Sequence, residues 1–242
     1  MATNREEIYK KLKSNFEAFF DRLQKACEKA GRNPQEITVV GAAKTVPYYV
    51  IDVAQELGLK IIGENRVQEA YEKYQHLGNK VSWHLIGHLQ TNKVKKALEI
   101  FDMIQSVDSL HVALEIEKRA SMMGKIVPVL IEVNTSGEPS KFGIEPGLVF
   151  ALITEILNLP HLKLMGFMTL GPGLAVENPE HSRPCFRELY ELREKAQKEF
   201  NLALPYLSMG MSSDFEVAIS EGSNMIRIGT LLFGPRPAYK EA

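Results

Sequence analysis

Residues 37–47 read ITVVGAAKTVP: a β-branched, apolar run that predicts a buried strand, then a turn that contains one glycine. A doubly wound α/β sheet usually carries a glycine-rich turn after its first strand. Here the turn has neither the G-x-G-x-x-G pattern of dinucleotide-binding folds nor the G-x-x-x-x-G-K-[ST] pattern of P-loops. The turn therefore favours a closed barrel over an open sheet.

Strand-like and helix-like patterns alternate along the rest of the chain. Eight apolar runs predict strands: ITVVGA (37–42), KIIG (60–63), VSWHLI (81–86), FDMIQS (101–106), VPVLIEVN (127–134), LKLMGFMT (162–169), LPYLSMG (204–210) and NMIRIG (224–229). Helical patterns lie between them, near residues 47–57, 65–76, 91–99, 109–123, 146–157, 180–199 and 213–221. Eight strand–helix units in about 240 residues predict an α/β fold, a (β/α)8 TIM barrel. We expect residues 1–242 to form this single domain.

One long amphipathic helix is expected before the first strand. Apolar side chains recur there at steps of three and four residues. They are Ile8, Leu12, Phe16, Phe19, Phe20, Leu23, Cys27 and Ala30. Gly31 and Pro34 end the pattern, so the barrel should carry an extra N-terminal helix.

Composition excludes several classes of protein. The formal charge of −1 leaves no basic surface of the kind that nucleic-acid binding requires, so nucleic acid is not an expected partner. Cys27 and Cys185 have no nearby cysteine or histidine at metal-ligand spacing, which suggests neither a disulfide framework nor a zinc site. No signal peptide or membrane-spanning stretch is evident. We expect a cytoplasmic protein without membrane contact.

Lys44 follows the first predicted strand directly, at the end of a barrel where active sites gather. A lysine there invites a functional explanation because its charge is costly to bury. Burial lowers the pKa of a lysine amine and makes it a nucleophile toward carbonyls, the usual route to a Schiff base. The alternative is a lysine that points into water or pairs with a carboxylate.

The loops after the seventh and eighth predicted strands have the character of an anion site. Residues 208–215, SMGMSSDF, supply glycine and hydroxyls before a helix, and residues 227–230, RIGT, follow the last strand. Barrels often bind phosphate at these two loops, and closure places the eighth strand beside the first. The expected ligand carries a carbonyl and a phosphate. Structural alternatives remain: Ser212 as a helix cap, Arg227 paired with Glu221 or Glu64, and Gly229 as a turn.

Several motifs resemble the pyridoxal phosphate homeostasis family. They are AAKTVP (42–47), GENRVQE (63–69), WHLIGHLQTNK (83–93), VNTSGEPSKFGI (133–144), GFMTL (166–170) and LSMGMSSDFEVAISEGSNMIRIGTLLFGPR (207–236). The resemblance implies a barrel like the N-terminal domain of alanine racemase, of fold type III among pyridoxal phosphate proteins. It also implies that the cofactor pyridoxal 5'-phosphate is held as a Schiff base on Lys44.

The resemblance also implies roles for eight further residues. Four would contact the cofactor's phosphate: Ser212, Ser213, Gly229 and Thr230. The other four would surround its ring, with Arg227 at the pyridine nitrogen, Asn65 beside the ring, and His84 and Met168 on the barrel wall. An inward histidine such as His84 is alternatively a satisfied core residue.

The expected function is pyridoxal phosphate homeostasis, and with it amino and keto acid balance, by a carrier without catalytic turnover. An arginine at the pyridine nitrogen disfavours ring protonation and weakens the electron sink that carbanion chemistry needs. The chain stops at Ala242, so we expect the second base of the racemases, from their additional domain, to be missing. Expected partners are the cofactor and apoenzymes that receive it, and the expected state is a monomer or weak dimer. A weak racemase, a cofactor-free aldolase and a structural protein are the alternatives.

Overall fold

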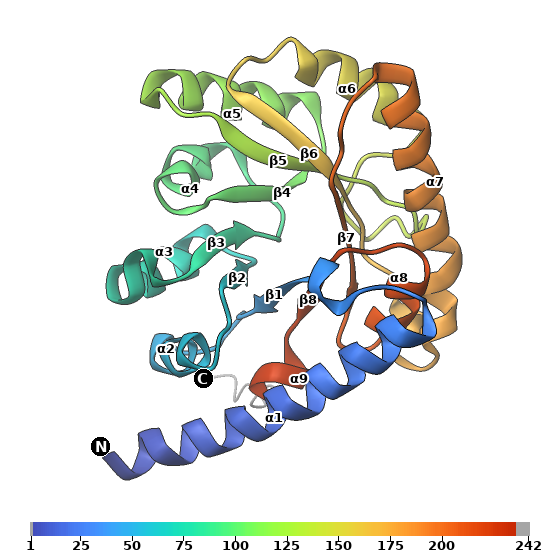
Figure 1. The fold of residues 1–242 in the computed structure, drawn as a ribbon. Coiled ribbons are helices and arrows are strands. Elements are labelled where there is room, and N and C mark those ends of the chain that lie inside the picture. The colour runs from blue at the N-terminus through green and yellow to red at the C-terminus, as the bar shows by residue number, and fades with distance from the viewer. Residues whose placement is uncertain (1, 236–242) are drawn as a thin grey trace.

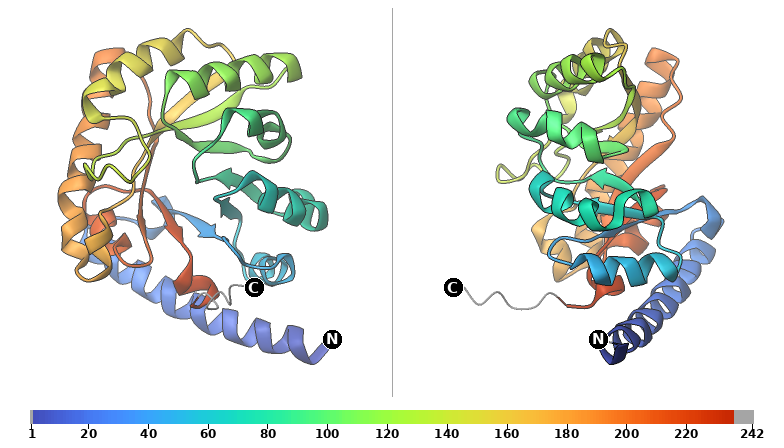
Figure 2. Two further views of the ribbon diagram at one scale, coloured as in Figure 1. Left: turned by 180° about the vertical axis from the view of Figure 1, so that it is seen from behind. Right: turned by 90° about the vertical axis from the view of Figure 1, so that its left-hand side faces the viewer.

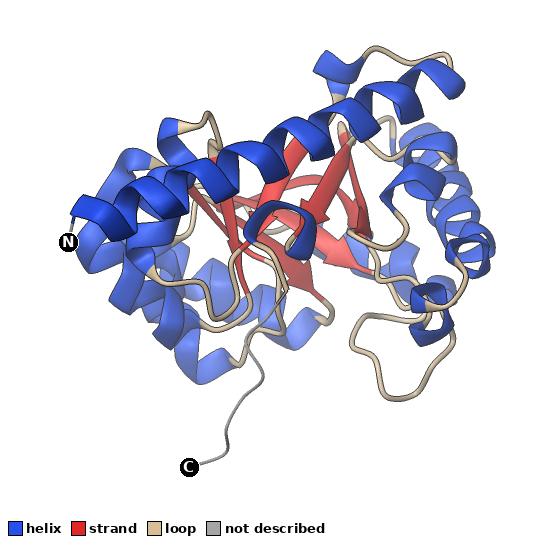
Figure 3. Ribbon diagram, turned by 90° about the horizontal axis from the view of Figure 1, so that it is seen from below, coloured by secondary structure: helices blue, strands red, loops and turns tan. Residues whose placement is uncertain are grey.

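The computed structural model describes residues 2–235, and within them eight parallel strands close into a barrel in the order β1 to β8. Figure 3 shows the strands enclosed by helices. The strands are β1 (Thr38–Ala42), β2 (Ile61–Glu64), β3 (Ser82–Leu85), β4 (Met103–Val107), β5 (Val127–Glu132), β6 (Leu162–Met168), β7 (Tyr206–Met211) and β8 (Met225–Ile228). The predicted (β/α)8 TIM barrel is confirmed, because each predicted strand overlaps one of these.

Helices connect successive strands on the outside of the barrel (Figure 1). They are α2 (Tyr48–Glu56), α3 (Val67–Leu77), α4 (Val94–Ile100), α5 (Leu110–Met123), α6 (Val149–Leu157), α7 (Arg183–Phe200) and α8 (Phe215–Ser220). Short 3-10 helices lie in the loops at Pro34–Glu36, Gly78–Lys80, Thr91–Lys93, Pro146–Leu148, Gly173–Val176 and Pro179–Ser182. Every predicted crossover helix is present, and the short helix α9 (Thr230–Phe233) is an addition that the sequence patterns did not predict.

The expected N-terminal helix is present as α1 (Ala2–Lys29), which lies across the outside of the barrel beside α8 and α9 (Figures 1 and 2). Phe19 is buried and packs against Phe215 of α8, with ring centroids 5.5 Å apart. The Asn15 side-chain amide donates to the Leu232 carbonyl in α9 at 3.0 Å. Helix α1 therefore packs against α8 and α9, the helices that follow β7 and β8. Within residues 2–235, no helix is both long and apolar enough to cross a membrane.

Two layers of side chains fill the molecule. Alternate residues of the strands point into the barrel, where Val40, Met103, Leu130, Met168 and Met225 form a compact apolar cluster. The strand residues between them face the helices and join a larger core that runs from α1 to α9. The interior is therefore packed, and the open space for a ligand lies at the ends of the strands.

Candidate functional site

Lys44 stands between two cavities at the carboxyl end of the barrel. It follows the last residue of β1 by two positions and is half-buried. The larger cavity, of about 600 Å³, is lined by Lys44, Asn65, Arg66, Val67, Gln68, Ile86, Gly87, His88, Gln90, Lys93, Glu132, Phe142 and Leu170. The smaller, of about 190 Å³, is lined by Lys44 and by the residues that follow β8, Gly229 and Thr230 among them. The lysine thus faces open space on two sides, as a nucleophile requires.

Closure of the barrel brings one of the two predicted phosphate loops, the loop after β8, to this lysine, whereas Ser212 and Ser213 of the other loop line neither cavity. Strand β8 pairs with β1, as the sequence predicts, and the register places Arg227 opposite Val40 and Ile228 opposite Gly41. Gly229 and Thr230 therefore lie at the mouth next to the end of β1.

The serine turn after β7 is joined to the loop after β8. The Ser212 hydroxyl accepts hydrogen bonds from the Gly229 N–H at 3.2 Å and the Leu231 N–H at 3.4 Å. This corrects the structural alternative for Ser212, since Asp214 is the N-cap residue of α8 and Ser212 instead bonds across to the next loop. Ser213 is half-buried, and its backbone N–H has no acceptor among residues 2–235. This N–H remains available for an anion.

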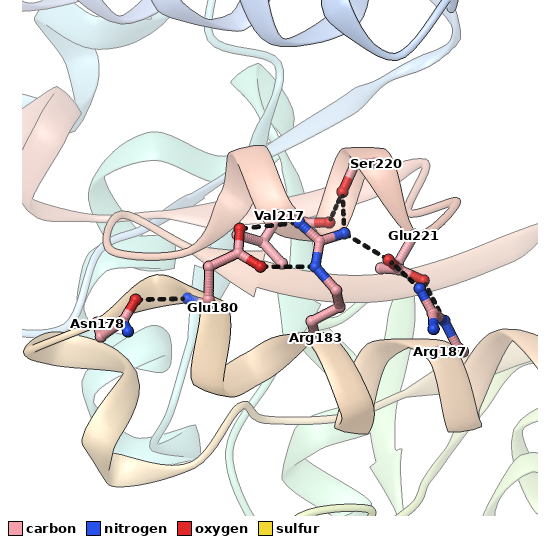
Figure 4. Close-up of polar contacts among 7 residues, drawn as sticks. All are labelled: Asn178, Glu180, Arg183, Arg187, Val217, Ser220 and Glu221. Carbon is pink, nitrogen blue, oxygen red and sulfur yellow. Dashed lines mark hydrogen bonds and ion pairs between the residues drawn. The ribbon is translucent and has the colours of Figure 1, made fainter.

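A clamp of ion pairs fixes α8, the helix that follows the serine turn (Figure 4). The Arg183 guanidinium contacts Glu180 at 2.6 Å and Glu221 at 2.5 Å. Arg187 pairs with the other oxygen of Glu221 at 3.1 Å. Because Arg183 and Arg187 belong to α7, these contacts bind the end of α8 to its neighbour. Glu221 is thus committed to these two arginines and does not pair with Arg227.

Arg227 lies inside the barrel, at the start of a chain of polar contacts. Its guanidinium donates to the Ser208 hydroxyl and to the Thr169 carbonyl, both at 2.7 Å. Ser208 donates in turn to the Gln105 side-chain oxygen at 2.6 Å. Burial lowers the pKa of Arg227 to about 10, opposed by the charges of Glu132 and Asp214, so the guanidinium stays protonated at neutral pH. The expected pairing alternatives with Glu64 and Glu221 are both wrong.

Of the other three residues predicted to surround the ring, Asn65 lies at a cavity, whereas His84 and Met168 do not. Asn65 is exposed and lines the larger cavity, together with Lys44. His84 and Met168 are buried in the barrel interior and line neither of the two cavities at Lys44. The His84 ring bonds the Gln105 amide at 2.9 Å, and burial lowers its pKa to about 4, so the ring is neutral. The structure gives His84 the contacts of a satisfied core residue.

Glu132 is a cavity residue that the sequence reasoning missed. It ends β5, is 3% exposed and lines the larger cavity, and its carboxylate oxygen Oε2 is buried without a hydrogen-bond partner in residues 2–235. Burial, and then the charge of Asp108, raise its pKa to about 7, against the opposing effect of Arg227. An acidic residue inside the apolar run VPVLIEVN was the available signal, because a charge is rarely placed in a buried strand without a partner.

Sequence comparison places the chain in a family. Residues 14–237 match the family described as alanine racemase, N-terminal domain. The pyridoxal phosphate homeostasis protein of Aquifex aeolicus is 52% identical, over 89% of this chain and 94% of that protein. The protein of the same name from Escherichia coli is 36% identical, over 91% and 95%. The chain belongs to the pyridoxal phosphate homeostasis protein family.

Solved structures agree with this family assignment. The family member PipY of Synechococcus elongatus, solved with pyridoxal phosphate bound, superposes with a TM-score of 0.80 at 31% identity, covering 92% of this chain and 100% of PipY. Alanine racemase of Clostridium difficile gives a TM-score of 0.71 at 18% identity, over 89% of this chain and 56% of the racemase. At that identity the racemase shows the fold alone, the barrel expected from the resemblance.

Proposed function

We propose that this chain binds pyridoxal phosphate through Lys44, as a Schiff base, and acts as a carrier that maintains cofactor supply without catalytic turnover. The observation that carries the proposal is the position of Lys44, an amine between two cavities of which one reaches Gly229 and Thr230. A ligand with an aldehyde and a phosphate matches such a pair of sites. The names of the homologues and the cofactor bound to PipY support the same ligand.

The residues present fit the cofactor. The Ser213 N–H lacks an acceptor among residues 2–235 and lies in the turn that Ser212 ties to Gly229, so this loop pair suits a phosphate. Thr230, at the smaller cavity, adds an exposed hydroxyl. Asn65 provides an amide on the side of the larger cavity. We assign to Ser212 the role of holding the two loops together. Ser213, Thr230 and Asn65 are assigned to contacts with the ligand.

The charge of Arg227 supports the absence of turnover. When bound, the cofactor supplies an electron sink, which is strongest when its ring nitrogen is protonated. Arg227 stays protonated in the barrel interior, and its charge already acts on Glu132, which lines the larger cavity. Arg227 lines neither cavity, but a fixed cation in the interior below them disfavours a second positive charge on a ligand. The proposed role is therefore binding and release of the cofactor, with apoenzymes as the recipients.

The experiment is an absorbance titration with pyridoxal phosphate. A Schiff base on a lysine gives a visible band that the free cofactor lacks, so the wild type should develop this band. Lys44→Ala should not, whereas the control Lys95→Ala, at an exposed lysine of α4, should match the wild type. An unchanged band in Lys44→Ala would refute the assignment of Lys44.

A further inference from the structure

The peptide groups on either side of Lys44 are both held by side chains from α3. The Lys73 ammonium donates to the Ala43 carbonyl at 2.8 Å. The Thr45 backbone N–H donates to Glu69 Oε1 at 2.6 Å. The residue before the proposed nucleophile and the residue after it are therefore fixed by the same helix.

These two side chains belong to one ion-pair cluster, in which Glu64 and Lys73 are buried and Glu69 is half-buried. Lys73 is 7% exposed and its Nζ also contacts Glu64 Oε1 at 2.7 Å and Glu69 Oε1 at 2.9 Å. Burial raises the pKa of Glu64 to about 7, although Lys73 opposes the effect. For Glu69, burial is outweighed by the hydrogen bonds from Lys73 and Thr45, so its pKa is lowered and it is a carboxylate at neutral pH. Breaking such a cluster is costly, because losing one partner leaves a buried charge unpaired.

The backbone held by Glu69 is strained. Thr45 has a φ of +65°, in the left-handed region that β-branched residues rarely adopt. Strain of this kind persists only where the surroundings enforce it. Two contacts enforce it here: the charge-assisted bond from the Thr45 N–H to Glu69, and the hydrogen bond from the Val46 N–H to the Ala43 carbonyl at 2.9 Å, which closes the turn. The sharp turn directly after Lys44 thus depends on a residue 24 positions further along the chain.

We propose that Glu69 and Lys73 are positioning residues that fix the backbone around Lys44, so that its amine meets the carbonyl carbon of the ligand. This inference rests on the proposed function, since it assumes that Lys44 bonds to an aldehyde. Glu69 and Lys73 lie outside the linings of both cavities, and their contact with the site runs through the backbone of residues 43–45, of which Lys44 and Thr45 line the smaller cavity. Their loss should therefore weaken aldehyde capture and leave phosphate recognition intact.

The test compares two ligands: pyridoxal phosphate, and pyridoxine phosphate, which has an alcohol in place of the aldehyde. Glu69→Ala removes the acceptor of the Thr45 N–H. We expect its dissociation constant for pyridoxal phosphate to rise at least about tenfold, because small displacements of a reacting group have large effects. Its dissociation constant for pyridoxine phosphate should change less than about twofold, because the phosphate loops are untouched.

Three further variants complete the design. Glu69→Gln retains an acceptor for the Thr45 N–H and should recover most of the affinity for pyridoxal phosphate. Glu69→Asp keeps a carboxylate beside Lys73, but its shorter side chain places the oxygen farther from the Thr45 N–H. This milder substitution serves as the test if Glu69→Ala does not fold. Glu72→Ala, at an exposed residue of the same helix, is the matched control and should bind both ligands as the wild type does.

Two results would overturn the positioning role. One is a folded Glu69→Ala or Glu69→Asp protein that binds pyridoxal phosphate as tightly as the wild type. The other is an equal loss of affinity for both ligands, which is the signature of general destabilisation. Failure of the proposed function would look different, because Lys44→Ala would then keep the wild-type preference for the aldehyde over the alcohol.

Discussion

Glu132 shows what a single buried carboxyl does to stability. Its pKa in the folded chain, about 7, lies above the ordinary value of 4.5, chiefly because of burial. The folded chain therefore retains a proton that the unfolded chain has lost between pH 4.5 and 7. By linkage, this residue makes the free energy of unfolding fall as the pH rises through that window, and the loss is complete above it.

Replacing Glu132 with Gln should remove this loss of stability. Relative to the wild type, the variant should gain up to about 3 kcal/mol in free energy of unfolding between pH 4.5 and pH 8. Urea denaturation at the two pH values measures the difference, with the exposed Glu72→Gln as control. A stability difference between variant and wild type that is the same at both pH values would contradict the raised pKa.

At the scale of elements, β6 and β7 approach each other more closely than a side chain allows. Gly166 in β6 has a φ of +146°, and a Cβ on it would lie 1.9 Å from the Tyr206 carbonyl oxygen in β7. Only glycine fits this point of the barrel wall. The wall on this side carries Ser208, which Arg227 contacts, so the approach also supports the interior below the site.

Gly166→Ala should lower the free energy of unfolding by at least about 2 kcal/mol, because it combines a steric clash with backbone strain. Gly147→Ala is the matched control: it is exposed, has ordinary backbone angles, and its Cβ would meet nothing within 4 Å. Thermal or urea denaturation of both variants provides the measurement. Equal stabilities for the two variants would show that the β6–β7 approach can relax.

The strands and the longer helices are predictable from sequence because each carries a complete apolar period. Helix α9 is missed because four residues are too few to show a helical period. The same distinction holds at the site. That Lys44, Gly229 and Thr230 lie together is predictable because strand ends meet at one mouth of any barrel. Glu69 and Lys73, which hold the backbone beside Lys44, are missed. Their hydrogen bonds from α3 depend on tertiary packing, which no local sequence pattern encodes.

Across the whole molecule, barrel closure creates the candidate site. Strands β1 and β8, from opposite ends of the chain, pair directly and bring Lys44 beside Gly229. The larger apolar core runs without interruption from α1 to α9, which supports the expectation of one domain over residues 1–242. That expectation stays a prediction, as do the monomeric or weakly dimeric state and the cytoplasmic location.

The most direct test of the account is to locate the covalent bond between the cofactor and the chain. Borohydride reduces a Schiff base to a stable secondary amine, so the protein is incubated with pyridoxal phosphate, reduced, digested and analysed by mass spectrometry. We expect one dominant modified lysine, Lys44, at one equivalent per chain. Modification spread over surface lysines, or a dominant label on another lysine, would contradict it.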